Sequence, residues 1–287
     1  MDATPTLALP MPLVSCEWLR DHLAKPSLRI VDASYFLPSA QRDAKAEYAA
    51  GHIAGAVFAD LDALSDATAP YPHTMPSAER LAPALGRLGI ARNHAVVVYD
   101  TSGQFFSAPR VWWMLRSIGH SAVSVLDGGL ARWRALGFPL SQQASAVAPT
   151  TYLPAQDAVG FRALADVRAA VDDHVTQIVD ARSAGRFHAT EPEPRPGVRG
   201  GHIPGARHVH YASLVTPSHT LKPAPELATL FTHAGVDVTR PVIASCGSGV
   251  TACAVALALT VLGATDVTVY DGSWTEWGSQ PDTPVER

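Results

Sequence analysis

The chain has 287 residues, enough for two ordinary domains, and it is 47% hydrophobic and 17% charged, a balance typical of globular rather than disordered proteins. Its formal net charge is −4, from 22 basic and 26 acidic side chains. Because no run of lysines and arginines stands out, nucleic acid and acidic membranes are not expected as partners.

Cysteine usage and the apolar runs predict the compartment. The three cysteines, Cys16, Cys246 and Cys253, form no Cys-x-x-Cys pair, so neither a disulfide scaffold nor a structural zinc site is expected. Residues 1–12 lack a basic stretch followed by an apolar run, so no signal peptide is predicted. The longest apolar stretch, residues 252–262, is too short to span a bilayer. Together these features predict a cytoplasmic protein.

Short apolar runs alternate with helical stretches along the chain. In chain order they are strands at Ala95–Tyr99 and Val123–Leu126 enclosing a helix at Ala108–Ser117, then strands at Val242–Ser245 and Val267–Tyr270 enclosing a helix at residues 251–262. Alternation of this kind predicts an α/β fold in which each domain is a mostly parallel sheet flanked by helices.

Four segments recur in the same order in both halves of the chain. Ile-Val-Asp-Ala stands at residues 30–33 and 178–181, and Gly-His-Ile stands at 51–53 and 201–203. The other matched pairs are 96–100 with 242–246 and 125–129 with 269–273. The offset between the halves drifts, as expected for the same elements joined by loops of different length.

We infer that the chain contains two copies of one domain. The expected N-terminal domain covers residues 1–141 and the C-terminal domain covers 161–287. Residues 142–160 are rich in Ala, Gln, Pro and Thr without periodicity, which predicts a linker.

The loop that begins at Cys246 is the candidate reactive site. Its residues, in order, are Cys246, Gly247, Ser248, Gly249, Val250 and Thr251, between a predicted strand and a predicted helix. Two glycines let such a loop curl so that its N–H groups point inward, and the helix adds its positive N-terminal end. This environment favours a thiolate at Cys246. The alternative is a small, inert core cysteine before a turn.

The doubled domain, this loop and the matched segments around it resemble the rhodanese superfamily over nearly the whole chain. More narrowly, Cys-Gly-Ser-Gly-Val-Thr-Ala at residues 246–252 resembles the active loop of the 3-mercaptopyruvate sulfurtransferases. The resemblance implies two tandem rhodanese-like domains and a persulfide on Cys246, with no metal and no organic cofactor. It also implies that the N–H groups of the loop bind the transferred sulfur, those of Gly247, Gly249, Val250 and Thr251 included.

The resemblance also bears on the sulfur donor. Thiosulfate-using relatives place basic residues where this loop has Gly247 and Ser248. Thiosulfate carries its charge next to the transferred sulfur, whereas 3-mercaptopyruvate carries it on a distant carboxylate, so a neutral loop suffices for the latter. We therefore expect 3-mercaptopyruvate as donor and a thiol such as thioredoxin, or cyanide, as acceptor. Thiosulfate:cyanide sulfurtransfer is the alternative.

Two arginines of the second half match the family's donor-binding residues. The resemblance assigns Arg186 and Arg195 to the carboxylate and keto group of the donor, a task suited to a planar guanidinium. The alternative is that both arginines pair with Glu191 and Glu193 on a solvated loop.

An acid and a histidine of the first half match family positions near the active loop. Asp62 and His73 could form a proton relay with Ser248 that handles the thiol proton of the donor and the leaving enolate. The alternatives are that Asp62 caps a helix and that His73 satisfies a buried turn.

Asp100 aligns with Cys246, and a carboxylate cannot carry sulfur, so the first domain is expected to be catalytically silent. Other functions remain open at this point. A cysteine phosphatase would need an arginine six residues after the cysteine, where this chain has Ala252. A sulfur-binding scaffold without catalysis is the third alternative, and the intact Cys246 disfavours it.

Overall fold

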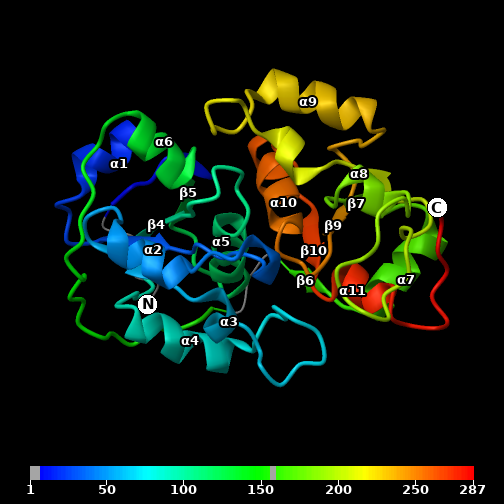
Figure 1. The fold of residues 1–287 in the computed structure, drawn as a ribbon, viewed down its shortest axis with the longest axis horizontal. Coiled ribbons are helices and arrows are strands. Elements are labelled where there is room, and N and C mark those ends of the chain that lie inside the picture. Colours follow the sequence, from blue (N-terminus) through cyan, green and yellow to red (C-terminus); the bar gives the residue numbers. More distant parts are fainter. Residues whose placement is uncertain (1–6, 156–159) are drawn as a thin grey trace. The chain divides into compact units, whose positions relative to one another are not determined.

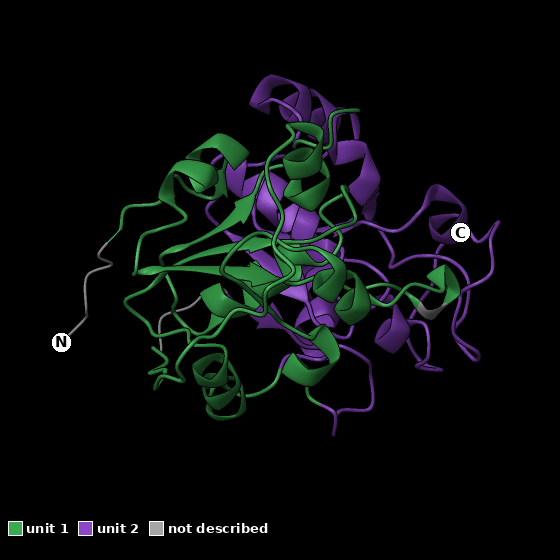
Figure 2. Ribbon diagram, turned by 60° about the vertical axis from the view of Figure 1, so that its left-hand side comes forward, with its two compact units in different colours: residues 1–66, 76–158, 217–220 green, residues 67–75, 159–216, 221–287 purple. Residues whose placement is uncertain are grey.

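The computed structural model describes residues 7–155 and 160–287, which form two compact units (Figure 2). Unit 1 takes the described parts of residues 1–66, 76–158 and 217–220. Unit 2 takes the described parts of residues 67–75, 159–216 and 221–287. Two short segments, 67–75 and 217–220, therefore belong to the unit that holds most of the other half of the sequence.

Each unit is built on a five-stranded sheet in which all paired strands are parallel (Figure 1). The strands of unit 1 are β1 Leu13–Val14, β2 Leu28–Asp32, β3 Ala56–Phe58, β4 Ala95–Tyr99 and β5 Val123–Leu126. Those of unit 2 are β6 Phe161–Arg162, β7 Gln177–Asp180, β8 Arg207–His208, β9 Val242–Ser245 and β10 Val267–Tyr270. Strand order is β1-β5-β4-β2-β3 in one sheet and β6-β10-β9-β7-β8 in the other. The identical order confirms the predicted pair of parallel sheets.

Helices flank both sheets. In unit 1 they are α1 Cys16–His22, α2 Ala44–Ala50, α3 Leu61–Leu64, α4 Ala78–Arg87, α5 Ala108–Ser117, α6 Gly129–Ala135 and the 3₁₀ helix η1 Pro38–Ala40. In unit 2 they are α7 Leu164–Asp173, α8 Ala184–Phe187, α9 Ala224–His233, α10 Ala252–Val261, α11 Ser273–Trp277 and the 3₁₀ helix η2 Tyr211–Leu214. None of the helices described here combines the length and apolarity that crossing a bilayer requires.

The central strands β4 and β9 are buried along their whole length. In β4, Ala95, Val97 and Tyr99 join the core formed with α1 and α6, while alternate residues face the opposite side. On both strands the bounds agree with those expected from the apolar runs. Burial on both faces explains why these strands are continuously apolar rather than alternating.

Residues 142–155, the described part of the expected linker, contain no helix or strand and pack against unit 1. Thr150 donates its N–H to the carbonyl of Gly86 at 2.9 Å, and Tyr152 is only 4% exposed. A Cβ on Gly86 would lie 2.3 Å from the carbonyl oxygen of Thr150, so glycine permits this close approach. Residues 156–159 lie outside the described residues.

The two Gly-His-Ile segments have the same structural task in each unit. His52 stacks on Tyr48 with a ring-centroid distance of 4.0 Å, and its backbone pairs with Ser141. His202 stacks on Phe187 at 3.7 Å and pairs with Glu286. Each histidine thus pairs, outside the named strands, with the segment that follows the last helix of its unit, which explains its recurrence in both halves.

Asp100 directly follows β4 and holds the loop that leads to α5. Its Oδ1 accepts hydrogen bonds from the N–H and hydroxyl of Ser102, at 2.9 and 2.5 Å. Its Oδ2 accepts the N–H groups of Ser107 and Ala108, at 3.0 and 2.9 Å. Asp100 is only 3% exposed, so this carboxylate is a built-in anion for the N–H groups at the start of α5.

Replacing Asp100 with alanine removes this anion and leaves the buried N–H groups of Ser107 and Ala108 without their acceptor. Because a hydrogen bond to a charged group contributes about 1.5–3 kcal/mol, we expect Asp100→Ala to lower the free energy of unfolding by about 3 kcal/mol. Urea denaturation measures the change. Asp21→Ala, at an exposed aspartate of unit 1, is the control and should cost less than about 0.5 kcal/mol. Equal effects of the two variants would contradict the assignment.

Candidate active site

Cys246 directly follows β9, the central strand of the sheet in unit 2, and α10 begins six residues later at Ala252. Ligands of open parallel sheets bind at the carboxyl ends of strands, so the sequence has placed this cysteine at the edge where chemistry is expected. Cys246 is 2% exposed and has no disulfide partner. Its burial is compatible with either a reactive or an inert thiol, and the surrounding loop decides between them.

The backbone of the loop is fixed by α11. The N–H of Cys246 donates to Ser273 Oγ at 3.1 Å, and its carbonyl accepts the N–H of Trp274 at 2.9 Å. The carbonyl of Gly247 accepts both the N–H and the hydroxyl of Thr275, at 3.0 and 2.5 Å. These bonds occupy the first two carbonyl groups of the loop and hold its start in one conformation.

Most N–H groups of the loop, by contrast, have no hydrogen-bond acceptor among the described residues. Four of them donate no hydrogen bond to any described residue: those of Gly247, Ser248, Val250 and Thr251. Gly249 has a φ of +73°, a left-handed conformation that glycine adopts without strain and that lets the loop curl. No side chain caps the first N–H groups of α10. A set of unfilled donors at a helix N-terminus is an anion-binding arrangement.

Unit 1 shows which kind of group binds the equivalent N–H donors there. There the N–H two residues after Asp100 and those at the start of α5 all bind the Asp100 carboxylate. In unit 2, Cys246 stands in the place of Asp100, and no side chain fills the corresponding N–H groups of Ser248 and Thr251. The site is therefore arranged to stabilise negative charge on sulfur at Cys246.

His73 and Ser248, which are 175 residues apart in sequence, meet in unit 2. His73 Nδ1 and Ser248 Oγ are 3.0 Å apart, and the two residues are 5% and 8% exposed. His73 has a φ of +60°, an unusual backbone conformation for a residue other than glycine. Such conformations gather at functional sites. The structure thus brings together two members of the expected relay, His73 and Ser248.

Asp62, the third expected member, lies in the first turn of α3 in unit 1. The helix cap is Asp60, whose carboxylate accepts the N–H groups of Asp62 and Ala63, so Asp62 is not needed as a cap. Burial, and then the negative charge of Asp60, raise the pKa of the Asp62 carboxyl above its usual value. Its participation in a relay with His73 and Ser248 stays a prediction.

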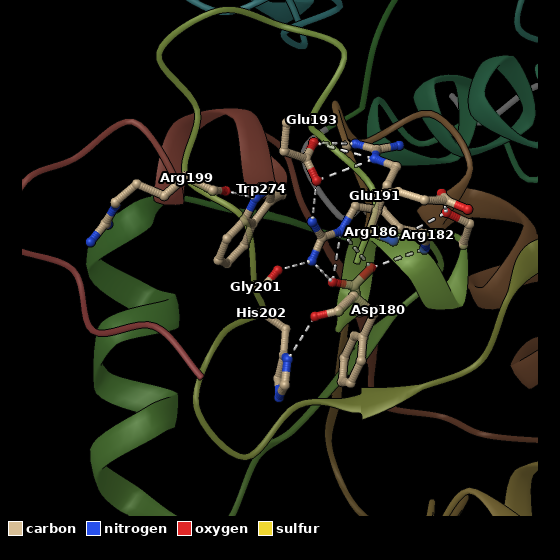
Figure 3. Close-up of polar contacts among 12 residues, drawn as sticks. Asp180, Arg182, Arg186, Glu191, Glu193, Arg199, Gly201, His202 and Trp274 are labelled. Atoms are coloured by element: carbon tan, nitrogen blue, oxygen red, sulfur yellow. Dashed lines mark hydrogen bonds and ion pairs between the residues drawn. The ribbon is translucent and has the colours of Figure 1, made fainter. Parts of the chain in front are cut away.

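The guanidinium of Arg186 lies against the active loop. A Cβ built on Gly247 would come within 2.9 Å of Arg186 Nη2 and 3.5 Å of Nη1. Arg186 also pairs with Glu193, with Nη2 and Oε2 2.6 Å apart (Figure 3). The side chains are 23% and 4% exposed, respectively. The alternative of an arginine paired with a glutamate is thus realised for Arg186, but beside the loop and largely buried rather than on a solvated surface.

Arg195 reaches the same loop through Thr275. Its Nη1 donates to Thr275 Oγ1 at 3.2 Å, and that hydroxyl in turn donates to the carbonyl of Gly247. Glu191, the other expected carboxylate partner, accepts a hydrogen bond from Ser183 Oγ at 2.9 Å instead. Both predicted donor-binding arginines are therefore linked to Gly247.

The remaining cysteines are buried and lack the features of the active loop. Cys253 Sγ donates to the carbonyl of Gly249 at 3.3 Å, beneath the loop. Burial, and then the negative charges of Glu17 and Asp127, raise the pKa of Cys16 to about 12, which keeps this thiol protonated at neutral pH. No cluster of three or more metal-binding side chains occurs among residues 7–155 and 160–287.

Three contributors to the site were missed from the sequence. They are Arg182, Thr275 and the start of α11, which bind Glu193, Arg195 and the loop backbone, respectively. The repeated Asp-Gly segment ahead of α11 did predict an equivalent element in both halves, but no local pattern indicates that Thr275 would face Gly247.

Comparison with known proteins identifies the family of the chain. A family model of the rhodanese-like domain matches residues 15–136 and 163–280. The chain is 44% identical to the 3-mercaptopyruvate sulfurtransferase of Homo sapiens, over 92% of this chain and 91% of that protein. It is 42% identical to an Arabidopsis thaliana protein named thiosulfate/3-mercaptopyruvate sulfurtransferase 1, mitochondrial, over 99% of this chain and 80% of that protein.

A solved structure gives the same result. SseA from Escherichia coli, described as a 3-mercaptopyruvate sulfotransferase with the rhodanese fold, aligns with a TM-score of 0.82 and 41% identity. The alignment covers 92% of this chain and 99% of SseA. Because both halves of the sequence match the family model and both sheets have the same topology, the chain belongs to the rhodanese family, as a protein with two rhodanese-like domains.

Proposed function

We propose that this protein is a 3-mercaptopyruvate sulfurtransferase that carries sulfur as a persulfide on Cys246. The observation that carries the proposal is the loop after β9, whose N–H groups are unfilled where the same groups of unit 1 bind the Asp100 carboxylate. A thiolate or persulfide at Cys246 would fill the same position. Relatives of this name that are 44% identical support the assignment.

The choice of donor follows from the charge of the loop. Gly247 and Ser248 are neutral, and the Arg186 guanidinium lies beside Gly247. Arg186 uses Nε and Nη2 for Glu193, so Nη1 and one hydrogen of Nη2 remain to bind a carboxylate in a two-point contact. A donor whose carboxylate is not attached to its sulfur, such as 3-mercaptopyruvate, can place that carboxylate on Arg186 while its thiol meets Cys246.

The first half-reaction is a nucleophilic attack by the Cys246 thiolate on the thiol sulfur of 3-mercaptopyruvate. A sulfur–sulfur bond forms and the sulfur–carbon bond of the donor breaks. The electron pair of the broken bond passes to carbon, giving the enolate of pyruvate, which becomes pyruvate by taking up the proton that the donor thiol loses. The loop N–H groups stabilise the persulfide anion that remains.

We propose that Ser248 and His73 move that proton. The imidazole and hydroxyl share a hydrogen bond of 3.0 Å inside the site, so a proton can pass between donor thiol, hydroxyl and ring. We propose Asp62, whose pKa burial raises, as the third member of the relay.

The second half-reaction transfers the outer sulfur to an acceptor thiol, for which we propose a protein such as reduced thioredoxin, with cyanide as a substitute in assays. We also propose a cytoplasmic location, where thiols are kept reduced, because all three cysteines are free. The mitochondrial name of the Arabidopsis relative belongs to that protein.

Removal of the nucleophile tests the proposal. Cys246→Ser should abolish turnover of 3-mercaptopyruvate, because a serine hydroxyl forms no persulfide. Pyruvate release under steady-state conditions is the measurement. Cys16→Ala, at a buried cysteine in unit 1, should leave turnover unchanged. Turnover retained by Cys246→Ser would exclude this chemistry.

A comparison of donors tests the argument from loop charge. With cyanide as acceptor, kcat/KM for thiosulfate should be at least about tenfold lower than for 3-mercaptopyruvate, a difference of about 1.4 kcal/mol in transition-state binding. Equal efficiencies would instead favour a thiosulfate sulfurtransferase and remove the charge of the loop as the basis of donor choice.

A further inference from the structure

Glu193 is a buried carboxylate shared by two arginines. Arg182 Nη1 lies 2.7 Å from Glu193 Oε1, and Arg186 Nη2 lies 2.6 Å from Oε2 (Figure 3). The side chain of Glu193 is 4% exposed and that of Arg182 is fully buried. Glu193 therefore connects the interior of unit 2 with the arginine that lies against the active loop.

Among Arg182, Glu193 and Arg186, Arg182 has the most contacts to the interior of unit 2. Asp180, at the end of β7, binds its Nε and Nη2, with Nη2 and Oδ2 2.6 Å apart. Nη2 also donates to the carbonyl of Gly201 at 2.7 Å, and the guanidinium carbon lies 4.4 Å from the ring centroid of Trp274. His208 holds the backbone of Arg182, with Nε2 2.7 Å from its carbonyl oxygen. Every nitrogen of the Arg182 guanidinium thus has an acceptor, and its backbone carbonyl is bound as well.

The ion pairs of Arg182 and Arg186 show what Glu193 contributes to the position of Arg186. Asp180 alone already neutralises Arg182 inside the protein, so burial of Arg182 does not require a second carboxylate. Glu193 instead places its second oxygen where it binds Nε and Nη2 of Arg186, at 3.2 to 3.3 and 2.6 Å. Two contacts to one edge of a planar guanidinium fix its orientation as well as its position.

The end of the Arg186 guanidinium that carries Nη1 and Nη2 lies against the loop. Nη2 lies within 2.9 Å of the position that a Cβ on Gly247 would take, and Nη1 has no hydrogen-bond partner among the described residues. Nη2 thus gives one hydrogen to Glu193, while Nη1 and the second hydrogen of Nη2 are available to a carboxylate beside the loop.

We infer that Glu193 is a positioning residue that holds Arg186 in the orientation needed to bind the donor carboxylate, with Arg182 as its buried anchor. The inference rests on the proposed function, because it takes Arg186 as the residue that binds the donor. Glu193 itself touches no substrate. It acts by setting the direction in which the free N–H groups of Arg186 point.

Steady-state kinetics of Glu193→Gln test this inference, because positioning and charge predict opposite results. The amide has one oxygen, and Nη1 of the buried Arg182 has no other acceptor among the described residues, so the NH₂ group of the amide faces Arg186 and releases it. Positioning predicts that KM for 3-mercaptopyruvate rises at least about tenfold while kcat changes less than about threefold. A role through charge alone predicts a lower KM, since a negative charge near an anionic donor is removed. An unchanged or lower KM would overturn the inference.

Two further variants guard against misfolding and nonspecific effects. Glu193→Asp keeps the buried charge but is one carbon shorter, so it should also raise KM while thermal unfolding stays close to that of the parent. Glu191→Gln is the matched control, since Glu191 contacts Ser183 rather than either arginine, and its KM should not change. If Glu193→Asp folds and leaves KM unchanged, Glu193 does not position Arg186.

A double-mutant cycle separates failure of this inference from failure of the proposed function. In an Arg186→Gln background, Glu193→Gln should have no further effect on KM, because its only route to the donor is gone. If Arg186→Gln raises KM but Glu193→Gln does not, the proposed function stands and the positioning role falls. If Arg186→Gln itself leaves KM unchanged, Arg186 does not bind the donor and both fall.

Discussion

The site depends on backbone N–H groups at the start of α10 that find no acceptor among the described residues. A buried donor left unsatisfied costs about 1–3 kcal/mol, so a loop with several such donors is stable only when an anion or water fills it. In unit 1 the Asp100 carboxylate meets this need permanently. In unit 2 a sulfur anion at Cys246 can meet it, and the loop is fixed for that purpose from behind by α11.

Duplication has therefore produced two versions of one anion site. The strand order, the Gly-His-Ile histidines and the helix that follows the central strand are the same in both units. The first residue after that strand differs: in unit 1 a fixed carboxylate fills the loop, and in unit 2 we propose that a cysteine accepts and releases a sulfur atom. The filled loop of unit 1 thus indicates where a negative charge would lie in the loop of unit 2.

Much of this was accessible from the sequence. The buried strands are continuously apolar, so Ala95–Tyr99 and Val242–Ser245 were predicted with their bounds, and the repeated motifs predicted the shared topology. The site was less accessible. His73 was expected near Ser248 only through the family resemblance, because the fold alone brings together residues 175 positions apart. Which of Glu191 and Glu193 pairs with Arg186 depends on the buried position of Arg182, and no local pattern encodes that choice.

The central claim is that sulfur resides on Cys246 during turnover. Peptide mass spectrometry after treatment with 3-mercaptopyruvate, in the absence of an acceptor, measures this directly. The account predicts the added mass of one sulfur atom on the peptide that contains Cys246, lost again when cyanide is supplied, and no such addition at Cys16. A peptide of unchanged mass despite release of pyruvate, or sulfur found on another cysteine, would contradict it.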